Sequence, residues 1–100
     1  MIEITIARNN KTFEITANGH SGYAPVGEDI VCSGVTSVML FAANAAICTN
    51  GELLKMESGE IGVTMPVSKQ TELIVEALKM TFDTMRIRYG EWINISLKGV

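Results

Sequence analysis

Residues 30–51 read IVCSGVTSVMLFAANAAICTNG, an uncharged stretch that is apolar almost all round. Asp29 before it is a good N-cap and Asn50-Gly51 after it is a stop signal, so one helix is predicted over residues 30–49. Polar residues interrupt the stretch, and its longest apolar run covers only residues 38–43. A membrane-spanning helix needs about 20 predominantly apolar residues, so we expect a buried core helix instead.

Segments that alternate between apolar and polar residues lie on both sides of this helix. Residues 2–6 and 13–17 alternate around Asn9-Asn10, which predicts a β-hairpin with a short turn. Residues 53–57 and 60–65, joined by Ser58-Gly59, predict a second hairpin.

Helical spacing returns after the second hairpin. Apolar residues recur every three or four positions to about Tyr89, behind a plausible N-cap at Ser68, and residues 93–97 alternate again. The predicted order is therefore ββαββαβ. This order predicts an α+β fold, a two-layer sandwich of two helices on a mainly antiparallel sheet, with residues 1–100 forming a single domain.

The composition narrows the classes of function. The chain has 47% hydrophobic residues, a net charge of −3 and a pI of about 5.0. An acidic chain without a Lys/Arg cluster lacks the electrostatic footprint of direct nucleic-acid binding. The N-terminus has no basic signal-peptide region, so we expect a cytoplasmic protein with no membrane partner. The apolar surplus favours burial of some surface against a second copy of the chain.

Two cysteines and one histidine are the residues with nucleophilic or metal-binding chemistry. One histidine supplies a His/Cys metal site poorly, so neither a metal nor another cofactor is expected. Cys32 falls in the first turn of the predicted helix, where unpaired N–H groups and the helix dipole favour a thiolate. His20 lies in the glycine-rich loop of residues 18–28, which can fold back over the helix start. Cysteine hydrolases need this pairing of thiolate and imidazole.

Each of these residues also has a structural interpretation. A lone cysteine in an apolar helix is usually a small core residue, and this interpretation fits Cys48. For Asp29, a helix-capping role is favoured over a direct catalytic role. Thr36 lies on the same helix face as Cys32 and can bond back to the carbonyl at position 32. Tyr23 can pack the loop rather than contact a substrate.

Two stretches together resemble a known family. Residues 19–24, Gly-His-Ser-Gly-Tyr-Ala, and residues 27–34, Gly-Glu-Asp-Ile-Val-Cys-Ser-Gly, are similar to the ribosomal-processing cysteine protease family, Prp. The resemblance implies that His20 is the catalytic histidine and Cys32 the catalytic cysteine.

The resemblance extends to supporting positions. Asp29 matches an acidic position just before the family's cysteine, and Gly34 matches a helix glycine. Inside a helix, glycine costs about 1 kcal/mol relative to alanine, so Gly34 predicts a close approach to the backbone there. Thr36 stands where at least some members have serine, so the hydroxyl is retained for binding substrate or the oxyanion. Tyr23 completes the set of supporting or substrate-binding candidates.

The family's activity is removal of a short N-terminal extension from the large-subunit ribosomal protein L-twenty-seven. The resemblance thus implies that this extension is the substrate, that the protein is a homodimer, and that residues 19–28 form a mobile loop over the site. The expected mechanism is attack by the Cys32 thiolate, with oxyanion binding by N–H groups at the helix start and proton transfer by His20.

Two alternatives remain at this point. One is a non-catalytic module that binds a ribosomal protein, with Cys32 in the core. The other is a thiol redox protein, which the lack of a CxxC motif disfavours.

Overall fold

The computed structural model describes residues 1–25 and 27–100, so position 26 of the predicted loop lies outside the described residues. The predicted order ββαββαβ is confirmed. The elements are β1 (Ile2–Arg8), β2 (Thr12–Asn18), α1 (Ile30–Cys48), β3 (Glu52–Glu57), β4 (Glu60–Pro66), α2 (Lys69–Tyr89) and β5 (Ile93–Lys98).

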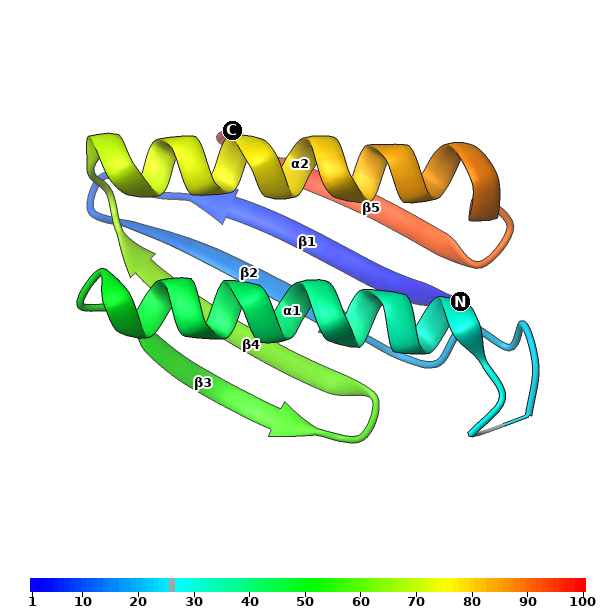
Figure 1. Ribbon diagram of the computed structural model, residues 1–100. Coiled ribbons are helices and arrows are strands. Elements are labelled where there is room, and N and C mark those ends of the chain that lie inside the picture. Colours follow the sequence, from blue (N-terminus) through cyan, green and yellow to red (C-terminus); the bar gives the residue numbers. More distant parts are fainter. Residues whose placement is uncertain (26) are drawn as a thin grey trace.

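The strands form one five-stranded sheet in the order β3-β4-β2-β1-β5. The β1/β2, β2/β4 and β3/β4 pairs are antiparallel, whereas β1 and β5 are parallel. Both helices cover the same face of the sheet and run antiparallel to each other (Figure 1). The predicted two-layer α+β sandwich with a mainly antiparallel sheet is therefore confirmed.

The core lies between the sheet and the helices. Alternate residues of β1 and β2 are buried, as the period of two requires when one face of a sheet packs against a second layer. The largest side chains below 2% exposure are Phe82, Ile4, Ile6, Ile15, Met39, Met65 and Ile93.

The first helix is less buried than its sequence predicted. One stripe of α1 packs into the core, but Leu40, Phe41 and Ile47 are 44%, 58% and 63% exposed. Cys48, expected in the core, is exposed as well. In a two-layer fold no third layer covers the helices, so apolar residues on the outer side of α1 stay in contact with solvent. By length and composition alone α1 could cross a membrane, yet its inner stripe lies in the core.

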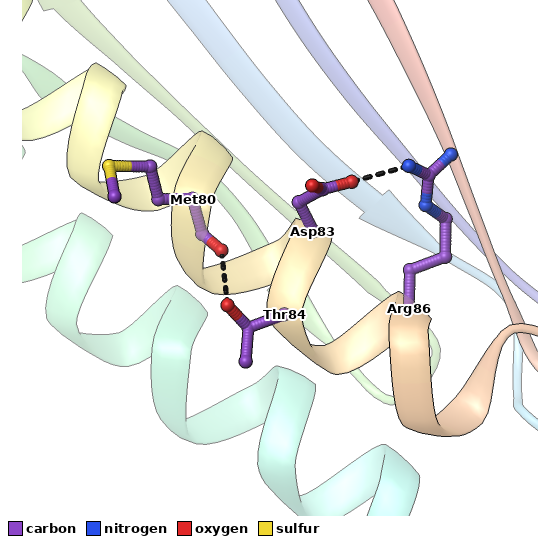
Figure 2. Close-up of polar contacts among 4 residues, drawn as sticks. All are labelled: Met80, Asp83, Thr84 and Arg86. Carbon is purple, nitrogen blue, oxygen red and sulfur yellow. Dashed lines mark hydrogen bonds and ion pairs between the residues drawn. The ribbon is translucent and has the colours of Figure 1, made fainter.

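The second helix is amphipathic, as predicted. The Ser68 hydroxyl accepts a hydrogen bond from the N–H of Thr71, and a reciprocal bond completes a capping box. On its exposed surface, Arg86 pairs with Asp83 and the Thr84 hydroxyl donates to the Met80 carbonyl (Figure 2). The residues that make these contacts are exposed, whereas Val75, Leu78 and Phe82 of the same helix lie in the core.

Gly34 lies where the two helices approach each other. A Cβ atom added there would lie 3.2 Å from the Cε atom of Met85 in α2. The predicted close approach at this glycine is confirmed.

Candidate functional site

The start of α1, the loop after β2 and the turn between β3 and β4 come together at one end of the molecule (Figure 1). Asp29 is the N-cap, as predicted. One of its carboxylate oxygens accepts hydrogen bonds from the N–H groups of Val31 at 3.0 Å and Cys32 at 2.9 Å. The other accepts the hydroxyl of Ser21 and the N–H of Ala24, so Asp29 ties the loop to the helix.

The carboxyl group of Asp29 is buried and held as a carboxylate. Burial, the largest single influence, raises its pKa by disfavouring the charge. The hydrogen bonds donated by Ser21 and by the N–H groups of Cys32, Ala24 and Val31 together outweigh burial and lower the pKa of Asp29 from 3.8 to about 2. Asp29 therefore contributes a fixed negative charge to the site at neutral pH.

Cys32 is a free, half-buried thiol in the first turn of α1. The backbone N–H of Ser21 donates a hydrogen bond to its Sγ atom over 3.3 Å. The thiol itself lies 3.7 Å from the hydroxyl oxygen of Ser21 and can donate to it. The sulfur is therefore held between the helix start and the loop.

Two cavities meet at Cys32. The larger, about 690 Å³, lies between the loop and α1, and the smaller, about 360 Å³, lies between α1 and the β3–β4 turn. Cys32 and Thr36 line both. His20 lines the larger cavity, whereas Glu57 and Glu60 line the smaller one. An extended ligand lying through both cavities would pass directly over the sulfur.

His20 is exposed, and its imidazole lies against the β3–β4 turn. A Cβ atom added at Gly59 would lie 2.7 Å from the Nε2 atom of His20. The carbonyl of Gly59 accepts a hydrogen bond of 2.8 Å from Gly19, next to the histidine. His20 and Cys32 share the larger cavity, but no hydrogen bond joins them within the described residues.

One sequence-based expectation concerns the donors that hold the oxyanion. N–H groups at the helix start were expected to hold it, but those of Val31 and Cys32 already donate to the Asp29 side chain. The N–H of Ser33 donates to the Asp29 carbonyl over 3.0 Å. The cap that stabilises the helix therefore occupies these donors.

The other candidates have different positions. Thr36 is exposed, lines both cavities, and shows no bond back to the carbonyl of Cys32 among the contacts of the described chain. Tyr23 packs edge-to-face on Trp92 and Tyr89, with ring centroids 4.8 and 5.9 Å away, so it anchors the loop to the end of α2. Gly34 faces the second helix rather than either cavity.

Two residues of the site were not singled out from the sequence. Ser21 is 3% exposed and contacts both Asp29 and Cys32. Its place beside His20 was the only signal. Gly59 looked like an ordinary turn residue, and its contact with His20 depends on the hairpin's position in the sheet.

The chain matches known proteins along nearly its whole length. A family model described as Cysteine protease Prp matches residues 1–94. The ribosomal processing cysteine protease Prp of Bacillus subtilis (strain 168) is 30% identical over an alignment 110 positions long, which covers 96% of each chain.

Two crystal structures of an essential ribosomal processing protease Prp from S. aureus share the fold. One, in complex with a covalently linked product peptide, has a TM-score of 0.83 and 24% identity over 98% of this chain and 100% of that one. The other, in complex with a substrate peptide, has a TM-score of 0.74 and 22% identity with the same coverage.

Proposed function

Because this chain belongs to the cysteine protease Prp family, we propose that Cys32 is its nucleophile and His20 the partner of Cys32. The proposed reaction is removal of the N-terminal extension of the ribosomal protein L-twenty-seven. The observation that carries the proposal is the position of Cys32, a half-buried thiol where two cavities meet at a helix start. This position differs from that of Cys48, which is exposed near the other end of α1.

The surroundings of Cys32 support a nucleophilic role. The N-terminal end of a helix carries a partial positive charge that stabilises an anion, and the Ser21 N–H already points at the sulfur. The two cavities that share Cys32 and Thr36 in their linings leave room for peptide on both sides of Cys32. A scissile carbonyl bound across these cavities would lie next to the nucleophile, which lowers the entropic cost of attack.

The proposed chemistry has two stages. His20 takes the proton of the Cys32 thiol, and the resulting thiolate attacks the scissile carbonyl carbon, whose oxygen becomes an oxyanion. Collapse of this intermediate expels the amine, which takes a proton from the His20 imidazolium, and leaves a thioester on the sulfur. Neutral His20 then takes a proton from water, and the resulting hydroxide displaces the sulfur and releases the carboxylate.

The oxyanion needs a donor outside the capped helix turn. The hydroxyl of Thr36 is exposed, lies one turn after Cys32 and lines both cavities. We assign it this role, because the amides of the first helical turn are engaged with Asp29. Preorganised donors of this kind are typically worth 10²–10³-fold in turnover.

His20 has to approach the sulfur during the reaction. It lines the same cavity as Cys32 but packs against Gly59. Catalytic hydrogen bonds are often long or unformed before substrate binds and tighten in the complex. The glycine-rich loop that carries His20 allows this movement.

The substrate assignment draws on the relatives. Those from Bacillus subtilis and S. aureus are named as ribosomal processing proteases, and one S. aureus structure holds a substrate peptide. We propose the same class of substrate here, with no metal or other cofactor, and a cytoplasmic location where ribosomes assemble. The exposed Leu40, Phe41 and Ile47 of α1 support a homodimer that buries apolar surface.

The substrate is tested with L-twenty-seven itself, prepared with and without its N-terminal extension. The purified enzyme is incubated with each form, and intact-mass spectrometry follows the products. The proposal predicts loss of the extension as one peptide and no change in the form that lacks it. Binding of the extended form without any cleavage would favour the non-catalytic binding module instead.

A further inference from the structure

We propose that Ser21 is a positioning residue for Cys32: its hydroxyl accepts a hydrogen bond from the thiol and holds the sulfur against the loop. The inference rests on the proposed role of Cys32 as nucleophile. It assigns a role to Ser21, which the sequence analysis did not single out, and a hydrogen bond to the thiol before substrate binds.

Ser21 occupies a closed position between the two functional groups. It is 3% exposed, and its hydroxyl contacts the Asp29 carboxylate on one side and the Cys32 thiol, 3.7 Å away, on the other. The N–H of Tyr23 also donates to this hydroxyl over 3.2 Å. The hydroxyl is thus fixed by three neighbours and cannot turn freely toward solvent.

The direction of the bonds follows from counting protons. A serine hydroxyl has one proton to donate, and an ionised carboxylate can only accept. Asp29 is ionised at neutral pH, so the hydroxyl proton goes to Asp29. The sulfur then faces the lone pairs of the hydroxyl oxygen. This arrangement favours a thiol, which can donate to the oxygen, over a thiolate, which would be repelled by it.

The backbone of Ser21 acts in the opposite sense. Its N–H donates to Sγ over 3.3 Å and favours the thiolate. Alanine at position 21 keeps this N–H and removes only the hydroxyl. The two effects of the residue can therefore be separated by a single substitution.

The other charged groups around the sulfur stay in place when the hydroxyl is removed. His20 and Asp29 line the larger cavity, and Glu57 and Glu60 line the smaller one. Lys55 pairs with both glutamates, at 3.9 and 3.0 Å. From α2, no charged side chain belongs to the described lining of either cavity. A change in the reactivity of Cys32 would therefore be due to removal of the Ser21 hydroxyl.

The test is the pH dependence of iodoacetamide alkylation at Cys32, mapped by peptide mass spectrometry in wild type and Ser21→Ala. Because thiolates alkylate and thiols do not, and because Ser21→Ala removes an acceptor that only the thiol can use, we expect the alkylation midpoint for Cys32 to move to lower pH in Ser21→Ala. Ser21→Thr retains a hydroxyl and should return the midpoint toward wild type. Exposed Cys48 is an internal control whose profile should not move.

Two results would overturn the inference. An unchanged Cys32 midpoint in folded Ser21→Ala means that the hydroxyl does not hold the thiol, and a midpoint at higher pH means that it donates to the thiolate. Should Ser21→Ala fail to fold, Ser21→Gly makes the same comparison. The proposed function has a separate test, since alkylation is measured without any substrate. It fails if cleavage persists without Cys32.

Discussion

Gly59→Ala adds a methyl group directly against the imidazole of His20. The new Cβ would lie 2.7 Å from Nε2, and a comfortable contact needs about 3.5 Å, so the ring has to retreat by ~1 Å. The backbone at Gly59 also has a φ of 77°, where an L-residue costs about 1–2 kcal/mol. We expect a loss of about 1–2 kcal/mol in the free energy of unfolding. A misplacement of this size can reduce kcat/KM by about 10²-fold.

Urea unfolding and cleavage of a peptide spanning the extension measure the two effects separately. Gly62→Ala is the matched control, because its Cβ meets only ordinary contacts of 3.6 and 3.8 Å, to Thr16 and Leu54. In a His20→Ala background, Gly59→Ala should cost no further activity, because the displaced ring is already absent. A folded Gly59→Ala enzyme that cleaves at the wild-type rate would show that the contact with Gly59 does not position His20, and wild-type cleavage by folded His20→Ala would refute the proposed role of His20.

Three further changes have defined outcomes. Asp29 has a lowered pKa of about 2, so its contribution to stability is complete above about pH 4 and is lost as the pH falls to about 2. Between pH 5 and pH 2, the free energy of unfolding should therefore fall more steeply for wild type than for Asp29→Asn, and equal slopes would contradict this. Gly34→Ala gains about 1 kcal/mol of helix propensity but makes a tight contact with the flexible end of Met85. The free energy of unfolding in urea should therefore stay within about 1 kcal/mol of wild type, and a loss above about 3 kcal/mol would refute this. Thr36→Val should lower kcat by about 10²-fold while Thr36→Ser keeps it, and equal turnover in steady-state assays would exclude Thr36 as the oxyanion donor.

Local patterns predicted the elements of this fold well. The alternation of residues 2–6 and the cap at Asp29 are properties of adjacent residues, and the structure confirms both. The strand order β3-β4-β2-β1-β5 was not predicted, nor was the parallel pairing of β1 with β5. Both depend on how connections cross between segments far apart in the chain.

The burial of α1 shows another limit of sequence patterns. A helix that is apolar almost all round has no polar stripe to mark its outer side. The sequence therefore could not distinguish Met39, which is fully buried, from Leu40 and Phe41, which are exposed. The same ambiguity put Cys48 in the core, where the structure does not have it.

At the site, the sequence identified residues but not their contacts. His20 and Cys32 were singled out by residue type, loop position and family resemblance, and the structure brings both to one cavity. The bonds to Asp29 engage two of the expected oxyanion donors, the N–H groups of Val31 and Cys32, a consequence visible only once the cap is formed. Ser21 and Gly59 gained roles from segments that fold against them.

The central claim is that Cys32 carries the cleavage. It is tested most directly by incubating Cys32→Ala and Cys48→Ala with the extended ribosomal protein, beside wild type, after circular dichroism has shown that all three are folded. We expect the extension to be removed by wild type and Cys48→Ala and to remain intact with Cys32→Ala. Cleavage by folded Cys32→Ala at the wild-type rate would contradict the account.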